Sequence, residues 1–223
     1  FGALLGKCLR RDTVAVLDLT DLLFEYLESY GKQWIRPIAA LGRLLESYTI
    51  RHSDHVVTIS RAMRDILTKQ YRVEQTRVDI VHDGVDSSVF SPRNGDALRR
   101  QIAPWAQHVC VLHGVIDPQD DPGLLVEAAP MVLSQFPNTA FWWVGNGAAV
   151  PELQSPVQHH TGQWPKPVSG WVSQSQVNDY LSASDLGIVV LPDTVSARGR
   201  VTLKEFEYWA CAKAAVLSCL PAL

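Results

Sequence analysis

The residues best suited to bind an anion lie near the C-terminus of the chain. A predicted strand is followed by a polar loop with Arg198, Gly199 and Arg200, and then by a helix carrying Lys204 and Glu207 three residues apart. The free N–H groups and the positive dipole end of a helix start attract phosphate. Lys204 and Glu207 share one helical face, which predicts a phosphate site beside a hydroxyl-binding carboxylate. Their spacing alone favours an ordinary surface ion pair.

Further candidates follow the other predicted strands, because ligands of open parallel sheets bind outside the carboxyl ends of the strands. His82 and His113 are candidate acid–base groups, with a structural role as the alternative. Trp171 is a candidate wall for a flat base or sugar ring, or a part of the interior. The remaining strand-end residues are Ser60, Gly84, Gly114, Gly145, Gly147 and Gly170. Neither GxGxxG nor GxxxxGK[ST] occurs, so the common nicotinamide and P-loop sites are not predicted.

Short apolar runs alternate with helical patterns, which predicts an α/β fold with parallel sheets covered on both faces. Ser53-Asp54 and Ser184-Asp185 each precede a predicted strand, as a faint internal repeat. The segment 87–94, with its proline, predicts a linker between two domains. Strands are expected at residues 14–19, 56–59, 78–81, 109–112, 140–144, 167–171, 186–191 and 214–218, and helices at 34–50, 61–71, 122–136, 150–159, 174–182 and around Lys204.

Composition excludes several classes of protein. The chain has 223 residues, 47% of them hydrophobic and 19% charged, as in soluble globular domains. A net charge of −3 argues against nucleic acid as a partner. Four scattered cysteines without ligand spacing predict neither a disulfide framework nor a metal site. The segment 34–48 has the composition of an interfacial membrane helix, or of a helix that covers its own sheet.

Six segments, taken in order, resemble the retaining glycosyltransferases of family 4, which have the two-domain GT-B fold. They are SDHVVTISRAMRDIL, VDIVHDGVDSSVFSP, GVIDPQDDPGLLVEAAPMV, FPNTAFWWVGNGA, VSGWVSQSQVNDYLSASDLGIVVLP and ARGRVTLKEFEYWACAKAAVLSCLPAL. The resemblance implies two Rossmann-like parallel-sheet domains. Residues 1–88 would be the C-terminal part of an incomplete acceptor-side domain, and residues 89–223 a nucleotide-sugar-binding domain truncated at its end. The chain begins with Phe and stops soon after a strand, so it is interpreted as a fragment.

The implied reaction moves a sugar from a nucleotide diphosphate sugar to a glycan or a lipid-linked acceptor, with retention of configuration. The donor is a substrate, and no cofactor is implied. The resemblance further implies a cytoplasmic enzyme of polysaccharide biosynthesis, free or peripheral at the inner face of the cell membrane. The alternatives are another GT-B enzyme, such as a sugar-nucleotide 2-epimerase, and a degenerate sugar-nucleotide-binding protein without turnover.

The resemblance also implies roles for individual residues. Glu207 resembles the glutamate that binds the nucleotide ribose, and Lys204 is then placed near the diphosphate. The expected donor-binding residues are Gly114, Gly145, Gly147, Gly170, Trp171, Arg198, Gly199, Arg200, Thr202, Lys204 and Glu207. Ser60, His82 and Gly84 are expected at the cleft between the domains. No catalytic residue is assigned.

The chain departs from the family pattern at three positions. Many relatives have an arginine and a lysine where this sequence has Val115 and Asp120, so that phosphate clamp is missing. Many also have a second glutamate where this sequence has Gly199. Arg198 and Arg200 are hypothesised to supply the missing charge.

Overall fold

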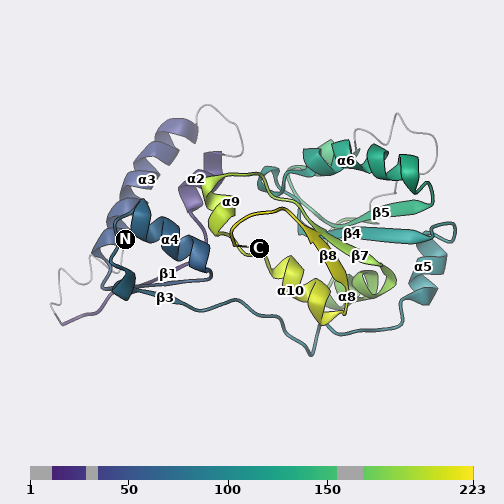
Figure 1. Ribbon diagram of the computed structural model, residues 1–223, viewed down its shortest axis with the longest axis horizontal. Helices are drawn as coiled ribbons and strands as arrows, with labels where there is room; N and C mark the ends of the chain where they lie inside the picture. The colour runs from purple at the N-terminus through teal and green to yellow at the C-terminus, as the bar shows by residue number, and fades with distance from the viewer. Residues whose placement is uncertain (1–11, 29–34, 155–167, 223) are drawn as a thin grey trace. The chain divides into compact units, whose positions relative to one another are not determined.

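The computed structural model describes residues 12–28, 35–154 and 168–222 (Figure 1). The chain divides into two compact units. The first unit consists of Phe1–Asp83, Asp193–Val201 and Cys219–Leu223, and the second of Gly84–Pro192 and Thr202–Ser218. The division follows Asp83, whereas the sequence placed it after residue 88. Two C-terminal segments, expected in the second domain, belong to the first unit. In one of them, helix α9, Val195–Gly199, packs on helix α4, Arg61–Lys69.

The first unit is built on a three-stranded parallel sheet in the order β1-β2-β3. Its strands are Val16–Leu19, His55–Thr58 and Val78–Ile80. Helices α2 (Leu23–Glu28) and α3 (Ile35–His52) pack on each other, and a short 3₁₀ turn, Gln75–Arg77, leads into β3. The buried core of this unit comprises Leu19, Leu22, Ile50, Val56, Met63, Leu67, Val73 and Val78.

Helix α3 has an exposed apolar side. Ala39 and Ile50 are fully buried, whereas Leu41, Leu44 and Tyr48 are 61%, 69% and 48% exposed. The helix therefore packs in this unit through the side with Ala39 and Ile50, and these three apolar side chains stay exposed. Among the described residues, no helix is both long enough and apolar enough to cross a membrane.

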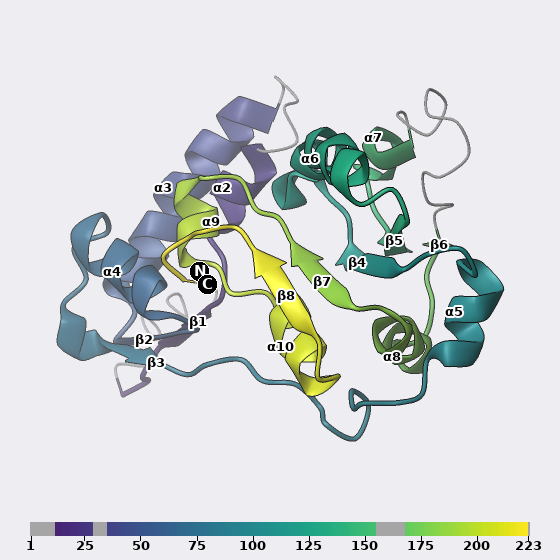
Figure 2. The same ribbon diagram turned by 45° about the vertical axis from the view of Figure 1, so that its right-hand side comes forward.

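The second unit is a five-stranded parallel sheet in the order β6-β5-β4-β7-β8 (Figure 2). Its strands are β4 His108–Val115, β5 Thr139–Asn146, β6 Val168–Ser169, β7 Leu186–Val189 and β8 Ala214–Leu217. The chain first builds outward from β4 through β5 to β6 and then returns to β7 and β8. The strand order therefore reverses between β4 and β7, which is the place where doubly wound sheets bind their ligands.

Helices cover both faces of this second sheet. Figure 2 shows α6 and α7 on one side and α8 and α10 on the other. The helices are α5 Asp96–Ile102, α6 Pro122–Gln135, α7 Val150–Gln154, α8 Gln174–Ala183 and α10 Leu203–Ala210, with a 3₁₀ turn at Pro118–Asp120. A sheet covered in this way buries its central strands, and β5 is buried from Thr139 to Gly145. Trp142 and Trp143, predicted in the core, are 2% and 0% exposed, which confirms that prediction.

The two Ser-Asp dipeptides have the same role in the two units. The Asp54 N–H donates to the Ala15 carbonyl, and the Asp54 carboxylate accepts from the Ala15 N–H, both at 2.8 Å. Asp185 makes the same two bonds with Val109, again at 2.8 Å. Each aspartate therefore fastens a helix-to-strand turn to the start of the neighbouring strand. The internal repeat suggested by the sequence is confirmed.

Several helix starts are encoded locally. Ser60 precedes α4, and its hydroxyl accepts from the Met63 N–H, which satisfies a donor of the first turn. Ser173 and Gln176 form a capping box at α8. The predicted helix 150–159 is seen as Val150–Gln154, and its remainder lies outside the described residues, as does Cys8. Cys110, Cys211 and Cys219 are free thiols.

Candidate functional site

The candidate site is built around the start of helix α10. Thr202 is the N-cap residue, and it forms a capping box with Glu205, which is 2% exposed. The Glu205 carboxylate accepts from the Thr202 N–H at 3.0 Å and also from the Thr202 hydroxyl. Glu205 therefore caps the N-terminus of α10. Lys204 and Glu207, on another side of the helix, remain as candidates for ligand binding.

Lys204 lies against the carboxyl end of β4, where the strand order reverses. Gly114 has a φ of +100°, and a Cβ atom there would lie 3.1 Å from Lys204 Cε. Only glycine adopts that backbone conformation readily, so this position admits the lysine stem. Lys204 is 9% exposed, and its Nζ lies 3.0 Å from Asp120 Oδ1. The alternative of a surface ion pair between Lys204 and Glu207 is therefore wrong, because Lys204 is buried against Asp120.

Glu207 lies beside His113, the residue before Gly114. Their Oε2 and Nε2 atoms are 3.2 Å apart, yet His113 Nε2 is buried without a hydrogen-bond partner. Burial raises the pKa of Glu207 to about 7, against the opposing charge of Lys204. Burial and Lys204 lower the pKa of His113 to about 3. At neutral pH His113 is therefore uncharged, while Glu207 exchanges a proton readily.

Glycines line the carboxyl ends of three adjacent strands in the second unit. Gly145 has a φ of +148°, and a Cβ atom there would lie 1.9 Å from the Gly114 carbonyl oxygen. The ends of β4 and β5 therefore approach more closely than side chains would allow. The Gly170 N–H donates to the Gly145 carbonyl at 3.3 Å, which adds the end of β6. Gly147 follows β5, and Trp171 next to Gly170 is 71% exposed.

The loop residues Arg198, Gly199 and Arg200 belong to the first unit. Arg198 donates to both carboxylate oxygens of Asp193. Arg200 Nε lies 3.9 Å from Asp21 Oδ1. The sequence predicted a polar loop here, whereas the structure forms α9, because the Thr194 hydroxyl accepts from the Ala197 N–H as an N-cap. A role of these residues in donor binding stays a prediction.

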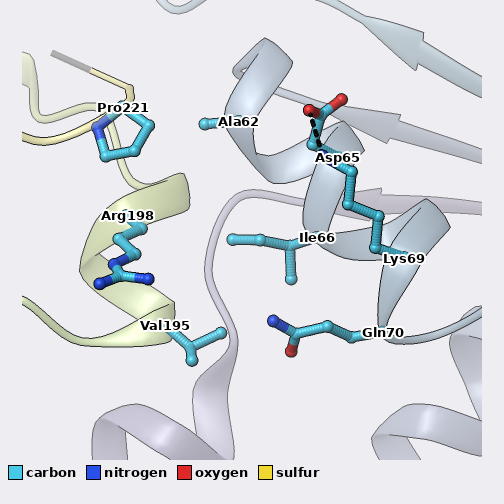
Figure 3. A pocket seen from close by; sticks show the side chains of 8 residues that line it. All are labelled: Ala62, Asp65, Ile66, Lys69, Gln70, Val195, Arg198 and Pro221. Atoms are coloured by element: carbon cyan, nitrogen blue, oxygen red, sulfur yellow. Dashed lines mark hydrogen bonds and ion pairs between the residues drawn. The ribbon is translucent and has the colours of Figure 1, made fainter.

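Arg198 also lines a hollow of about 210 Å³ between α4 and α9 (Figure 3). Ile66 and Val195 point into this hollow from the two helices, while Asp65 and Lys69 pair with each other at 3.0 Å on its rim. The full lining is Ala62, Asp65, Ile66, Lys69, Gln70, Val195, Arg198 and Pro221. Asp65, Lys69 and Arg198 at the rim thus each pair with a group of opposite charge. The hollow therefore has no excess of positive or negative charge from these residues.

Two of the three residues expected at the cleft, Ser60 and His82, make local hydrogen bonds in the first unit. The Ser60 hydroxyl donates to the Gly199 carbonyl at 2.7 Å. A side chain at position 199 would begin 2.9 Å from Met63 Cε, so Gly199 fills a place where a glutamate would displace its neighbours. His82 Nδ1 lies 2.9 Å from the Ile59 carbonyl oxygen. Gly84, the first residue of the second unit, has open space around its Cα.

Sequence reasoning identified Lys204 and Glu207 but missed how Asp120 is used. The sequence showed that Asp120 stands where many relatives have a lysine. It did not show that Asp120 contacts Lys204, which is 84 positions away along the chain. No spacing rule predicts such a pair. Glu205 could have been found, because Thr202 and Glu205 have the spacing of a capping box. Within the described parts of the chain, no three His, Cys, Asp or Glu residues gather as a metal site would require.

Parts of the chain are similar in sequence to glycosyltransferases. Residues 19–89 match the family described as Glycosyltransferase Family 4. A D-inositol 3-phosphate glycosyltransferase of Mycobacteroides abscessus is 34% identical over 95 residues, which are 42% of this chain and 21% of that protein. The enzyme of the same name from Streptosporangium roseum is 26% identical over 184 residues, 76% of this chain and 41% of that protein. The chain thus matches about a fifth to two fifths of these relatives.

Solved structures of low sequence identity share the fold. HepE of Anabaena, in complex with UDP and glucose, superposes with a TM-score of 0.72 at 17% identity, over 98% of this chain and 56% of that one. Sucrose-phosphate synthase from Thermosynechococcus elongatus gives a TM-score of 0.69 at 18% identity, over 98% and 54%. WaaG gives 0.68 at 13% identity, over 93% and 57%. The predicted GT-B fold is confirmed.

Proposed function

We propose a donor site and a reaction for this chain on the premise that it is related to the family 4 glycosyltransferases. The proposed reaction transfers a sugar from a nucleoside diphosphate sugar to a glycan or lipid-linked acceptor, with retention of configuration. The nucleotide would bind at the carboxyl ends of the strands of the second unit. The chain spans only part of its relatives, so this proposal concerns the protein to which it contributes.

One observation supports the proposal most strongly. Lys204 and Glu207 lie on one helix, the lysine beside Gly114 and the glutamate beside His113, at the reversal of strand order in a doubly wound sheet. Nucleotides bind at this place in such sheets, with phosphates near a helix start. Lys204 would form an ion pair with the diphosphate, and Glu207, one turn further along the helix, would accept hydrogen bonds from the ribose hydroxyls.

The geometry suggests how the site would favour departure of the diphosphate. Negative charge develops on the leaving phosphate oxygens in the transition state, and fixed positive groups stabilise it. Lys204 is buried next to the strand end, where little water screens its charge. Glu207, whose pKa is raised to about 7, accepts from or donates to a hydroxyl according to its protonation. Exposed Trp171 would cover the base or the sugar ring.

The acceptor side and the location in the cell remain part of the proposal. A lipid-linked acceptor would bring the protein to the inner face of the cell membrane as a peripheral protein. The exposed apolar side of α3, with Leu41, Leu44 and Tyr48 and with Arg36 at the start of the helix, is compatible with such a contact.

The test is release of free nucleoside diphosphate from a panel of UDP-, GDP- and ADP-sugars, followed by identification of the sugar product. We expect release with at least one donor, and at least tenfold less release in Glu207→Ala, because the ribose contact is lost. Glu152→Ala, on the exposed side of α7, is the matched control. A sugar product that is epimerised and not transferred would favour a 2-epimerase.

A second function is favoured by one specific contact. Asp120 neutralises Lys204, and the relatives' phosphate-binding arginine is Val115 here. Both features weaken stabilisation of a leaving diphosphate, as expected of a protein that binds sugar nucleotides without turning them over. Tight binding of a donor with no product from any acceptor preparation would support this second function and reject the first.

A further inference from the structure

The contact between Lys204 and Asp120 has a consequence for any phosphate ligand of the site. Both side chains are largely buried, at 11% exposure for Lys204 and 2% for Asp120, and Nζ lies 3.0 Å from Oδ1. A buried ion pair of this geometry is strongly coupled, because little water screens it. The positive charge of Lys204 is therefore already compensated before a ligand arrives.

Two described titratable groups of this site, His113 and Glu207, add no positive charge to it. His113 is neutral at physiological pH, because burial lowers its pKa to about 3. Glu207 has a pKa of about 7 and so is partly negative at neutral pH. Lys204, Asp120, His113 and Glu207 together thus have no surplus positive charge. A diphosphate with several negative charges would enter a site whose cation is already paired.

The Asp120 carboxylate is also held by a hydrogen bond from the neighbouring backbone. Its Oδ2 accepts from the Asp117 N–H at 3.1 Å, and the two residues form a capping box on the 3₁₀ turn Pro118–Asp120. The carboxylate therefore cannot leave Lys204 without disturbing that turn. Lys204 is on a flexible stem and its ammonium has several donors, so the lysine is the partner that can adjust.

We infer that Asp120 is a built-in competitor for Lys204, which lowers the affinity of this site for phosphate ligands and so sets the strength of donor binding. This inference rests on the proposed function, in that the phosphate is taken to be that of a nucleotide sugar. Asp120 acts through Lys204 and is a positioning residue. Like charges near each other in a poorly screened site repel strongly.

The test compares Asp120→Asn with the protein itself by calorimetry, with UDP, ADP, GDP and inorganic pyrophosphate as probes. Asparagine keeps the acceptor for the Asp117 N–H but removes the charge. We expect affinity for each bound phosphate probe to rise at least about tenfold, and affinity for uridine, which has no phosphate, to stay unchanged. The matched control is Asp121→Asn, at a residue with φ of 41° that asparagine also tolerates.

The outcomes separate this inference from the proposed function. Equal diphosphate affinity in Asp120→Asn and in the protein itself would overturn the inference and leave the proposed donor site standing. Tighter pyrophosphate binding without binding of any nucleoside diphosphate would support the inference and overturn the donor site. If no probe binds either protein, both are overturned. Asp120→Ser, in which a hydroxyl can still accept from Asp117, serves as the second variant if Asp120→Asn unfolds at a lower temperature.

Discussion

At the scale of the residue, the role of Lys204 could be predicted from the sequence but its contacts could not. Its place on a helix after a strand was enough to predict an anion site, because the chemistry of strand ends and helix starts is local. Its pairing with Asp120 could not be predicted, since that contact depends on how β4 and α10 pack together. The same holds for the raised pKa of Glu207, which burial produces.

His113 and Glu207 make opposing contributions to the pH dependence of stability. The pKa of His113 falls from 6.5 to about 3 on folding, so its contribution to stability is lost as the pH falls from 6.5 towards 3. The pKa of Glu207 rises from 4.5 to about 7, so the folded state gains stability as the pH falls from 7 towards 4.5. Between pH 6.5 and 4.5 the two effects partly cancel.

Glu207→Gln should remove the gain in stability that Glu207 provides as the pH falls. We expect its melting temperature to fall between pH 7 and pH 5 by roughly 2–4 °C more than that of the protein itself, since only the loss from His113 remains. Thermal denaturation followed by circular dichroism at a series of pH values measures this. Glu152→Gln is the control for a change of charge at an exposed site. Identical pH profiles for Glu207→Gln and the protein itself would contradict the raised pKa of Glu207.

At the scale of the element, the strands were predicted more reliably than the short helices. Apolar runs mark buried strands directly, and β4, β5 and β7 were found within a few residues of their ends. Helix α9 was not found, because its five residues include Arg198 and Gly199 and its stability comes from packing on α4. Helix α3 was found, and the side that it buries, with Ala39 and Ile50, depends on its neighbours.

The Ser-Asp turns give a prediction for elements in both units. Asp54→Ala and Asp185→Ala should each lower the free energy of unfolding by about 1–2 kcal/mol, because the Ala15 and Val109 N–H groups lose their carboxylate acceptors. Urea denaturation measures the change. Exposed Asp12→Ala is the matched control. A loss no larger than that of the control would show that these turns do not fasten the strands.

At the scale of the whole molecule, the sequence predicted two parallel-sheet units but not how the chain is shared between them. The segment 87–94, predicted as a linker because a proline-containing polar stretch interrupts the periodicity, lies a few residues after the division that follows Asp83. The returning segments, Asp193–Val201 and Cys219–Leu223, gave no such signal. Chain crossings of this kind depend on tertiary packing, and short stretches of sequence do not reveal them.

The central claim is that the second unit binds a nucleoside diphosphate through the side of α10 that carries Lys204 and Glu207. The most direct measurement is calorimetric titration of UDP, GDP and ADP into the protein and into Glu207→Ala. We predict that at least one nucleotide binds and that Glu207→Ala weakens its binding at least about tenfold, whereas exposed Glu152→Ala leaves it unchanged. Equal binding to the protein and to Glu207→Ala, or no binding of any nucleotide, would contradict the claim.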